Sequence, residues 1–445
     1  MKKLYISQAV DKVGKEIELS GWVHNKRDHK KIVFIDLRDQ TGIVQVVGGE
    51  QLKDLMPEDV VYIKGMVRQR PKNLVNPKLK TGGVEIDTKE FRLISKAEIP
   101  PIDLTKQVLN VSLPTLLDYR PLTLRHPKIA AIFRVQEVII ETFRQTLKDD
   151  GFCEFQAPIL VPAQAEGGAE IFPVKYFDHT VYLGQSPQLY KQMVLGMFEK
   201  VFTVTHAFRA EPSVTTRHLT EYVSLDAEMA FIDSWQDIIE KVEELIKQIV
   251  AEVNKECQEE LKMHNADTPK IPKKFPQLKL RAAQELIFKR SGRDIRQEPD
   301  LSPSDEEEIS RWAQEEKGSD FVFITHYPVS KRPFYTYPDP KDPEYTLSFD
   351  LLGRGMEWVT GSQRINDYQL LVDHIREWGN KPEAFELYLQ AFRYGMPPEG
   401  GFAMGAERMT ARMLGLNNIR EASLFPRDMQ RVDLRLSTAD QKSKK

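Results

Sequence analysis

Residues 208–228, with the sequence FRAEPSVTTRHLTEYVSLDAE, carry arginines, a histidine and several acidic residues on two apolar flanks with β character. A short polar loop separates the flanks, so the stretch predicts a β-hairpin within an antiparallel sheet. Arginine forks bind phosphate oxygens, and carboxylates bind an ammonium group. The hairpin therefore indicates an enzyme site that takes both ATP and an amino acid.

Five short runs with β character recur between Glu16 and Lys96, broken by Gly, Asp, Asn and Pro. They read EIELSGWV, KIVFIDLRD, GIVQVVG, DVVYIKGMVRQR and GVEIDTKEFRLI. Five such strands match a small closed barrel of the OB type, although another small barrel or a sandwich fits the count equally well. Arg27, Phe34 and Gln45 lie among lysines and arginines on or near the first three runs. Aromatic, amide and basic side chains together favour single-stranded RNA, whereas a solvated charged surface is the plainer alternative.

The 445 residues predict at least two domains. We expect the barrel at 1–103, a proline-marked connector at 104–128 and a second domain at 129–445. Helical spacing of apolar residues predicts a helix over 129–149, followed by a strand over 152–163 that contains Pro158. After further helices, strand patterns resume at Phe321, which makes the second domain an antiparallel sheet flanked by helices in an α+β chain.

Two later segments are expected to be helical. Residues 235–261 are strongly amphipathic, which predicts one long helix. The acidic run DEEE at 305–308 lies near a helix start, where the macrodipole favours negative charge. We assign these acids to capping and solvation rather than to a metal site.

The overall charge of the chain excludes no class of binding partner. The 63 basic and 66 acidic residues leave a net charge of -3, so nucleic-acid binding needs a local basic face. The two cysteines, Cys153 and Cys257, have neither metal-ligand spacing nor a disulfide pattern. The N-terminus lacks the apolar core of a signal peptide, and nowhere do eighteen apolar residues run together. We therefore expect a soluble cytoplasmic protein without a membrane partner.

Three motifs carry a family resemblance. They resemble the three signatures of class II aminoacyl-tRNA synthetases. The first signature is matched by the 129–149 helix with the Pro158 strand, the second by FRAE with RHLTEYVSLDAE, and the third by GFAMGAERM. Their order and spacing match over essentially the whole chain, barrel included. The subgroup with an N-terminal OB barrel contains the aspartyl, asparaginyl and lysyl enzymes. Within this subgroup the chain is most similar to short, archaeal-like aspartyl-tRNA synthetases. Three segments carry this similarity: EGGAEIFPVKYF, GQSPQLYKQ and YGMPPEGGFAMGAERM.

Lys191 is the sharpest substrate signal, because asparaginyl enzymes do not place a lysine after QLY. Its ammonium and the fork of Arg364 suit a side-chain carboxylate, whereas an amide would leave buried charges uncompensated. Alone, Lys191 would be a solvated helix lysine. By resemblance Glu166 lies on a mobile loop beside Gly167 and Gly168, and Asp226 holds the substrate ammonium or orients Lys191. The full set expected to bind L-aspartate is Glu166, Ser186, Gln188, Lys191, Arg209, Asp226, Thr360 and Arg364.

The resemblance also implies an ATP site with Mg2+. Arg209 grips the α-phosphate, Tyr222 and Arg408 sandwich the adenine ring, and Arg209 and Arg408 are the expected catalytic residues. Glu211 accepts from the adenine amino group, and Arg217 with His218 reaches the outer phosphates. The ATP set is Arg209, Glu211, Arg217, His218, Leu219, Tyr222, Glu357, Gly405, Glu407 and Arg408, and the metal ligands are Glu357 and Thr360.

The chain departs from the family at two positions. Thr360 stands where serine is common, which keeps the hydroxyl but adds a methyl group. Glu399 stands where aspartyl enzymes commonly have a histidine. A carboxylate there would repel the substrate side chain if it pointed inward, so it points outward, pairs with a cation, or belongs to a different means of discrimination.

The implied reaction forms aspartyl-adenylate and pyrophosphate from aspartate and ATP, and then transfers aspartate to the 3′ end of tRNA. His24, Arg27, Phe34, Gln45 and Pro77 are expected to contact the anticodon. His24 and Pro77 match enzymes that charge both tRNA-Asp and tRNA-Asn, and we favour that relaxed form. The family also implies a homodimer built on the 129–149 helix and the Pro158 strand.

Three alternatives stay open at this point. An asparagine--tRNA ligase is the nearest enzyme. A paralogue that makes a free amino acid often lacks the barrel, which this chain has. A non-catalytic tRNA-binding paralogue is expected to have lost the phosphate arginines, yet Arg209, Arg217 and Arg408 are present.

Overall fold

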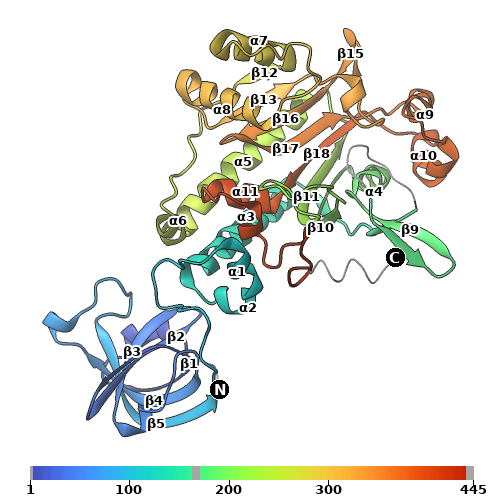
Figure 1. Cartoon of the computed structure of the whole chain (residues 1–445). Helices are drawn as coiled ribbons and strands as arrows, with labels where there is room; N and C mark the ends of the chain where they lie inside the picture. Colours follow the sequence, from blue (N-terminus) through green and yellow to red (C-terminus); the bar gives the residue numbers. More distant parts are fainter. Residues whose placement is uncertain (1–3, 163–170, 437–445) are drawn as a thin grey trace. The chain divides into compact units, whose positions relative to one another are not determined.

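The computed structural model describes residues 4–162 and 171–436, and Figure 1 traces them from blue to red. The chain separates into two compact units. One comprises residues 1–113 with 121–126, and the other comprises residues 114–120 with 127–445. Among the described residues, no helix is long and apolar enough to cross a membrane.

The smaller unit is a closed five-stranded barrel, as the sequence predicts. Its strands are β1 (Glu16–His29), β2 (Ile32–Asp39), β3 (Gly42–Gly48), β4 (Val60–Gln69) and β5 (Val84–Ser95), and they close in the order β1-β2-β3-β5-β4. Side chains at alternate positions, such as Val33, Ile35 and Leu37, fill the interior. Short 3-10 helices η1 (Ile6–Lys12), η2 (Glu50–Leu52) and η3 (Lys72–Leu74) accompany the strands.

An eight-stranded sheet forms the centre of the larger unit (Figure 1). Its order is β12 (Gln277–Lys279), β13 (Phe321–Thr325), β16 (Ser348–Gly353), β17 (Met356–Gln363), β18 (Glu399–Gly405), β11 (Glu221–Ala230), β10 (Lys200–Phe208) and β6 (Cys153–Glu154). Neighbours from β13 to β10 are antiparallel, and only the edge strands β12 and β6 pair in parallel. This confirms the predicted antiparallel sheet and the hairpin, which is β10–β11.

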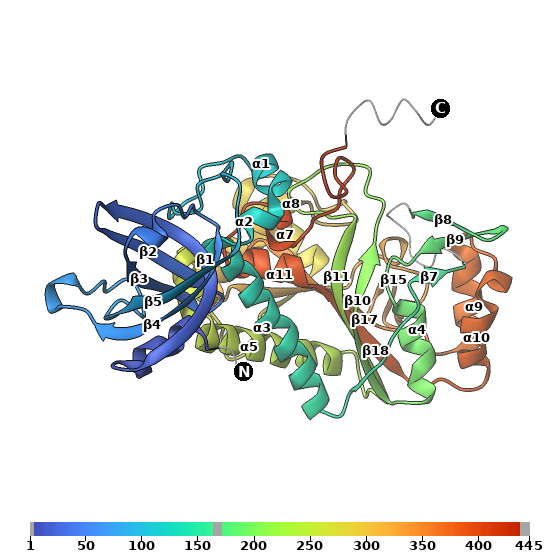
Figure 2. The ribbon, with the colours of Figure 1, turned by 90° about the horizontal axis from the view of Figure 1, so that it is seen from below.

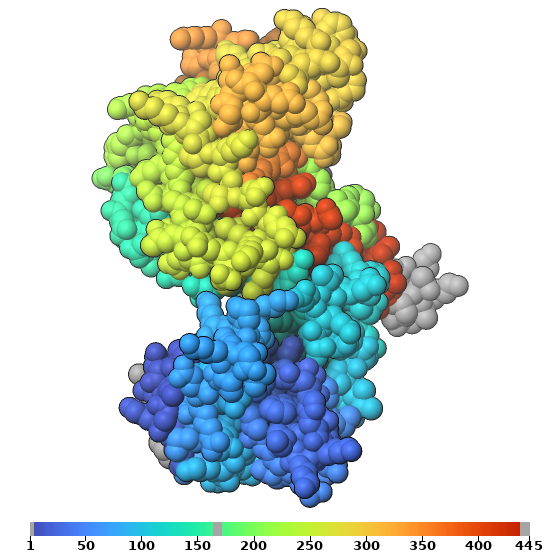
Figure 3. Space-filling view, turned by 90° about the vertical axis from the view of Figure 1, so that its left-hand side faces the viewer, coloured from blue at the N-terminus to red at the C-terminus, as the bar shows by residue number. Residues whose placement is uncertain are grey.

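Two long helices, α3 (Pro127–Asp149) and α5 (Gln236–Glu256), lie side by side across one face of this sheet (Figure 2). Phe143 of α3 and Ile246 of α5 bury their side chains with Phe202, Trp358 and Phe402 of the sheet. Apolar residues at helical spacing thus form the core. The outer side of α5 is yellow-green in the space-filling view of Figure 3.

Two predictions of element length are wrong. The helix expected over 235–261 is divided into α5 and α6 (Gln258–His264), because Cys257 leaves helical geometry. The strand expected over 152–163 is divided between β6 and β7 (Leu160–Val161), which belong to different sheets. Pro158 lies between them, and a proline cannot donate a ladder hydrogen bond.

The other described elements belong to neither the barrel nor the central sheet. They are α1 (Leu113–Asp118), α2 (Arg120–Thr123), β8 (Pro173–Tyr176), β9 (His179–Leu183), α4 (Gln188–Met193), η4 (Val194–Gly196), α7 (Leu280–Ser291), α8 (Pro303–Lys317), η5 (Val329–Lys331), β14 (Pro338–Asp339), β15 (Asp342–Thr346), α9 (Tyr368–Glu377), η6 (Pro382–Phe385), α10 (Glu386–Arg393), α11 (Ala406–Met413) and η7 (Ile419–Ala422). Strands β7, β9 and β8 form one small sheet, and β14 pairs with β15.

The acidic run at the start of α8 has mixed roles. Asp305 forms a capping box with Ser302, and Glu307 is exposed, as the sequence predicts. The assignment to capping and solvation is wrong for Glu306, whose side chain is only 16% exposed and pairs with Arg217.

Candidate active site

A cleft of about 230 Å³ opens beside the hairpin loop, between strands β11, β17 and β18 and helix α11. Its lining includes all ten residues that the sequence assigns to ATP, together with Thr360. These residues come from segments as distant as 209–222 and 405–408. We call this pocket the arginine cleft, since Arg209, Arg217 and Arg408 all face it.

The arginines of the cleft lie against acidic and aromatic neighbours. The Arg408 Nη1 atom lies 3.1 Å from the backbone oxygen of Glu357 and 3.2 Å from its carboxylate. The guanidinium of Arg209 lies 5.8 Å from the centre of the Tyr222 ring. Arg408 and Glu357 are each about one quarter to one third exposed, so incoming groups can reach both side chains.

Arg217 donates to the carboxylate of Glu306 and to the backbone oxygen of Gly355. Burial raises the pKa of Glu306 to about 7, although the charge of Arg217 acts in the opposite direction. The nearby Glu357 carboxylate raises this pKa further. A phosphate group would compete with Glu306 for the same guanidinium.

Two further polar residues of the cleft make local contacts. The His218 Nδ1 atom lies 2.8 Å from the Thr215 hydroxyl. The Glu407 carboxylate accepts from the backbone N–H of Val223 at 3.1 and 3.2 Å. Burial raises the pKa of Glu407 to about 7, and the backbone donors only partly offset it.

Glu357 and Thr360, the two residues expected to hold a metal, both line the cleft. Thr360 pairs with Asp350 across β16 and β17, and Arg332 donates to the Thr360 hydroxyl at 3.1 Å and to Asp350 Oδ2 at 2.8 Å. Among the described residues, no hydrogen-bond donor is found for the buried Asp350 Oδ1. Within residues 4–162 and 171–436, no three His, Cys, Asp or Glu side chains form a metal-binding group. Carboxylate and hydroxyl oxygens with few protein ligands fit Mg2+ that completes its shell with phosphate and water.

A second group of charges lies buried beneath the cleft. We call Lys191, Asp226, Glu228 and Arg364 the buried charge cluster, because their side chains are 0–6% exposed. Lys191 Nζ lies 3.1 Å from Asp226 Oδ1, 3.1 Å from Glu228 Oε2 and 3.2 Å from the backbone oxygen of Phe402. An ammonium has three N–H donors, so these contacts occupy all of them.

Arg364 faces the same acid. Its Nε donates to Glu228 Oε1 at 2.7 Å, its Nη1 donates to the Ser362 hydroxyl at 2.6 Å, and its Nη2 lies 3.4 Å from Glu228 Oε2. Burial opposes ionisation of Glu228, but Arg364 and Lys191 outweigh it and lower its pKa. Gly401 of β18 leaves the room that Glu228 needs, since a Cβ at this position would overlap the carboxylate.

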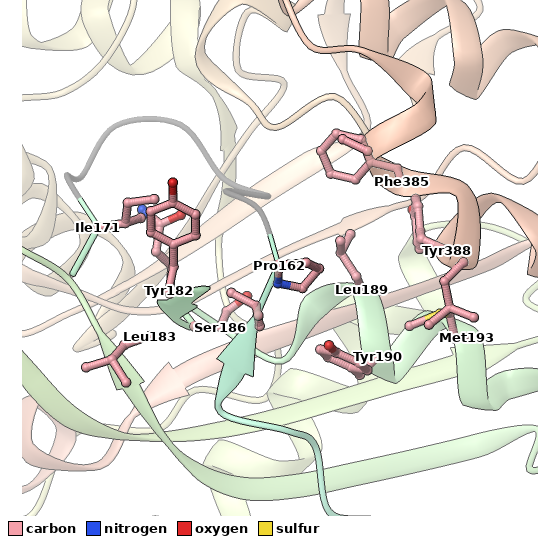
Figure 4. A pocket seen from close by; sticks show the side chains of 15 residues that line it. Pro162, Ile171, Tyr182, Leu183, Ser186, Leu189, Tyr190, Met193, Phe385 and Tyr388 are labelled. Carbon is pink, nitrogen blue, oxygen red and sulfur yellow. The ribbon is translucent and has the colours of Figure 1, made fainter. Parts of the chain in front are cut away.

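The residues expected to bind L-aspartate do not all lie together. Lys191, Asp226 and Arg364 belong to the buried charge cluster, and Arg209 and Thr360 line the arginine cleft. Asp226 accepts from the Ser224 hydroxyl, and Ser224 lines the arginine cleft, so cleft and cluster meet at β11. Gln188 donates to Gln192 Oε1 at 3.0 Å. Ser186 lines a separate apolar pocket of about 80 Å³, whose lining also includes Leu189 and Tyr190 of α4 and Phe385 (Figure 4). Glu166, Gly167 and Gly168 lie outside the described residues.

On the barrel, three of the five expected anticodon residues come together. Arg27 pairs with Phe34 across β1 and β2, and its Nη2 donates to Gln45 Oε1 at 3.1 Å. His24 instead lies 3.1 Å from Arg38 Nη1, and burial followed by the Arg38 charge lowers its pKa. Pro77 is exposed in a turn between β4 and β5.

Sequence reasoning gave no site role to Glu228 or Asp350, and it assigned Glu306 to capping and solvation. Glu228 follows Asp226 by two residues on β11, so the period of a strand could have placed both on one face. Asp350 faces Thr360 only through strand pairing, and Glu306 is 89 residues from Arg217 in the chain. Local patterns contain no signal for those two contacts.

Comparisons with known proteins identify both parts of the chain. Residues 112–429 match the family described as tRNA synthetases class II (D, K and N), and residues 17–94 match the OB-fold nucleic acid binding domain. The "Aspartate--tRNA(Asp/Asn) ligase" of Deinococcus radiodurans is 42% identical over 94% of this chain and 96% of its own length. The "Aspartate--tRNA(Asp) ligase" of Pyrococcus abyssi is 39% identical over 96% and 98%.

Solved structures agree in fold. Asparaginyl-tRNA synthetase from Pyrococcus horikoshii, complexed with asparaginyl-adenylate, matches with a TM-score of 0.88 and 35% identity over 97% of this chain and 99% of the other. Aspartyl tRNA synthetase from Entamoeba histolytica matches with a TM-score of 0.86 and 30% identity over 97% and 93%. Backbone similarity alone thus does not separate the two amino acids.

Proposed function

The chain belongs to the family of class II tRNA synthetases (D, K and N), and from this premise we propose that it activates L-aspartate with ATP and transfers it to tRNA. The observation that carries the choice of aspartate is the buried charge cluster beside the arginine cleft. Its cations, Lys191 and Arg364, are held in fixed positions by acids that are themselves buried. Relatives named as aspartate--tRNA ligases support the same choice.

Recognition of the aspartate side chain rests mainly on Arg364. Its described contacts use three of its five N–H groups, which leaves donors for a carboxylate. Lys191 already has three acceptors, so it contributes positive charge and holds Asp226 and Glu228 in place. An asparagine amide would turn N–H groups toward these cations and lose charge-assisted hydrogen bonds. Ser186 and Gln188 are proposed to contact the substrate as well, and Glu166, which lies outside the described residues, remains an expected contact.

The first step joins the substrate carboxylate to the α-phosphorus of ATP and releases pyrophosphate. Arg209 stabilises the negative charge that develops on the α-phosphate, Arg217 with His218 holds the outer phosphates, and Arg408 packs on adenine opposite Tyr222. Tyr222 stacks on adenine, Glu211 accepts from its amino group, and Leu219, Gly405 and Glu407 complete the ATP pocket. No side-chain base is needed, since positioning and electrostatic stabilisation are sufficient.

Glu357 and Thr360 would hold Mg2+, with Asp350 beside them. The ion neutralises phosphate charge when it is bound. In the second step the 3′-terminal hydroxyl of tRNA attacks the adenylate carbonyl and releases AMP. The barrel residues Arg27, Phe34 and Gln45 would stack on and read anticodon bases.

The proposal includes tRNA-Asn as a second acceptor. Relatives bear both names, "Aspartate--tRNA(Asp/Asn) ligase" and "Aspartate--tRNA(Asp) ligase", so they do not decide between them. His24 and Pro77 favour the relaxed form. We also propose a homodimer through α3 and the segment around Pro158, which sedimentation at low concentration tests. The free cysteines Cys153 and Cys257 fit a cytoplasmic location.

Aminoacylation of purified tRNA-Asp and tRNA-Asn with aspartate and with asparagine tests the proposal. We expect aspartate on both tRNAs and asparagine on neither. Asparagine on tRNA-Asn would establish an asparagine--tRNA ligase, for which the asparaginyl-adenylate complex of similar fold is the supporting observation. Aspartate on tRNA-Asp alone would refute only the relaxed form.

A further inference from the structure

Glu399, the first residue of β18, is an acidic side chain in the interior of the larger unit. It is 0% exposed. Its Oε1 accepts from Gln192 Nε2 at 2.6 Å, and the Gln192 Oε1 in turn accepts from the hydroxyl of Tyr388 at 3.1 Å. Its Oε2 is buried and has no donor among the described residues. An ionised carboxylate with an unpaired oxygen would be costly at such a position.

Across β11 and β18, Glu399 pairs with Ala230 and Glu228 pairs with Gly401, so the Glu399 and Glu228 side chains are diagonal neighbours on one face of the sheet and can share a hydrogen bond. Two carboxylates in contact cannot both be ionised without strong repulsion, and a single shared proton removes it. Burial and then the charge of Glu228 raise the pKa of Glu399 well above its usual value, although Gln192 and Arg364 act in the opposite direction. Arg364 and Lys191 lower the pKa of Glu228. The proton therefore belongs to Glu399.

The charge balance supports the same assignment. Lys191 and Arg364 provide two positive charges, and Asp226 and Glu228 provide two negative charges, so the buried charge cluster is neutral. The neighbouring groups of Glu399 on α4 and α10, Gln192 and Tyr388, are uncharged donors. A third ionised acid would give the cluster a net negative charge and repel a substrate carboxylate.

We propose that Glu399, in its protonated form, donates a hydrogen bond from Oε2 to Glu228 and acts as a positioning residue that holds the Glu228–Arg364 pair ready for a substrate carboxylate. This role rests on the proposed activation of aspartate. The side chain is buried and, among the described residues, pairs with no cation, so the first two arrangements expected from the sequence are wrong and the proposal is a form of the third. A neutral hydrogen-bond donor at this position helps to select aspartate over asparagine, because it fixes the orientation of Arg364 through Glu228.

A comparison of Glu399→Gln with Glu399→Met distinguishes the hydrogen-bonding role of Glu399 from its contribution to packing. Glutamine is neutral, has the same shape, and can donate to Glu228 while accepting from Gln192. Methionine has a similar volume but no donor. In ATP–pyrophosphate exchange we expect Glu399→Gln to keep the KM for aspartate within about threefold, and Glu399→Met to raise it about tenfold or more. The KM for ATP should stay unchanged in both.

Infrared difference spectra supply a readout independent of activity. Wild type minus Glu399→Gln at pH 8 should show the carbonyl band of a protonated carboxylic acid. A carboxylate band in its place would overturn the proposal, and so would an equal rise in aspartate KM for Glu399→Gln and Glu399→Met. If Glu399→Met does not fold, the glutamine variant and the spectrum still decide. Failure of wild type to use aspartate would refute the proposed function but leave the infrared result intact.

Discussion

The arginine cleft and the buried charge cluster are built from the same residue types but differ in their access to water. In the cleft, the Arg408–Glu357 pair is 25% and 33% exposed, and its partners can be exchanged for phosphate oxygens. In the cluster, Lys191, Asp226 and Glu228 are 0–1% exposed and already paired. Exposed pairs contribute little stability, whereas breaking a buried pair leaves an uncompensated charge. The cleft is therefore suited to binding and releasing ATP, and the cluster to fixed recognition of one side chain.

The largest expected effect comes from Lys191→Met in the cluster. It leaves Asp226 and Glu228 without the ammonium that contacts both, which should lower the free energy of unfolding by about 3–5 kcal/mol. Urea denaturation measures the loss. Arg408→Met is the matched control in the cleft, and we expect it to cost less than about 1 kcal/mol. Equal losses would remove the distinction between the two regions.

Arg209→Gln should lower activity strongly and stability little, which is the reverse of the stability loss expected for Lys191→Met. The guanidinium is expected to act on phosphate charge that develops in the transition state, so kcat for ATP–pyrophosphate exchange should fall about 100-fold or more. The free energy of unfolding should change by about 0.5 kcal/mol or less. A rise in KM for ATP with unchanged kcat would instead assign Arg209 to ground-state binding.

Glu407 offers a pH test at the floor of the cleft. Its pKa rises from the usual 4.5 to about 7 on folding, so the folded chain holds this proton more tightly than the unfolded chain. The stabilisation is complete below pH 4.5 and is lost as the pH rises to 7, by up to about 3 kcal/mol. Glu407→Gln should remove this slope when its stability is compared with wild type between pH 5 and 7. Parallel curves for the two proteins would contradict the assignment.

Glu306→Gln should have the smallest effect. Arg217 would no longer be held by an acid that competes with phosphate, so the KM for ATP should fall about two- to fivefold at pH 8. The KM for aspartate should not change. An increase in KM for ATP would show that Glu306 positions Arg217 for ATP rather than competing with it.

Local patterns in the sequence predicted the barrel, the antiparallel sheet and the hairpin, because strand periodicity and turn residues are encoded within a few positions. The resemblance assembled the ten ATP residues, and the structure brings them into one cleft. Contacts between distant segments were not predictable. The contacts of Glu306 with Arg217 and of Glu399 with Gln192 join segments that are far apart in the sequence. Pro158 and Cys257 also interrupt elements whose apolar pattern alone is continuous.

ATP–pyrophosphate exchange without tRNA tests most directly whether the buried charge cluster selects aspartate. The measurement compares kcat/KM for aspartate and asparagine in the wild-type protein with Mg2+. We predict exchange with aspartate that exceeds exchange with asparagine about 100-fold or more. Exchange with asparagine and none with aspartate would contradict the role assigned to Lys191 and Arg364.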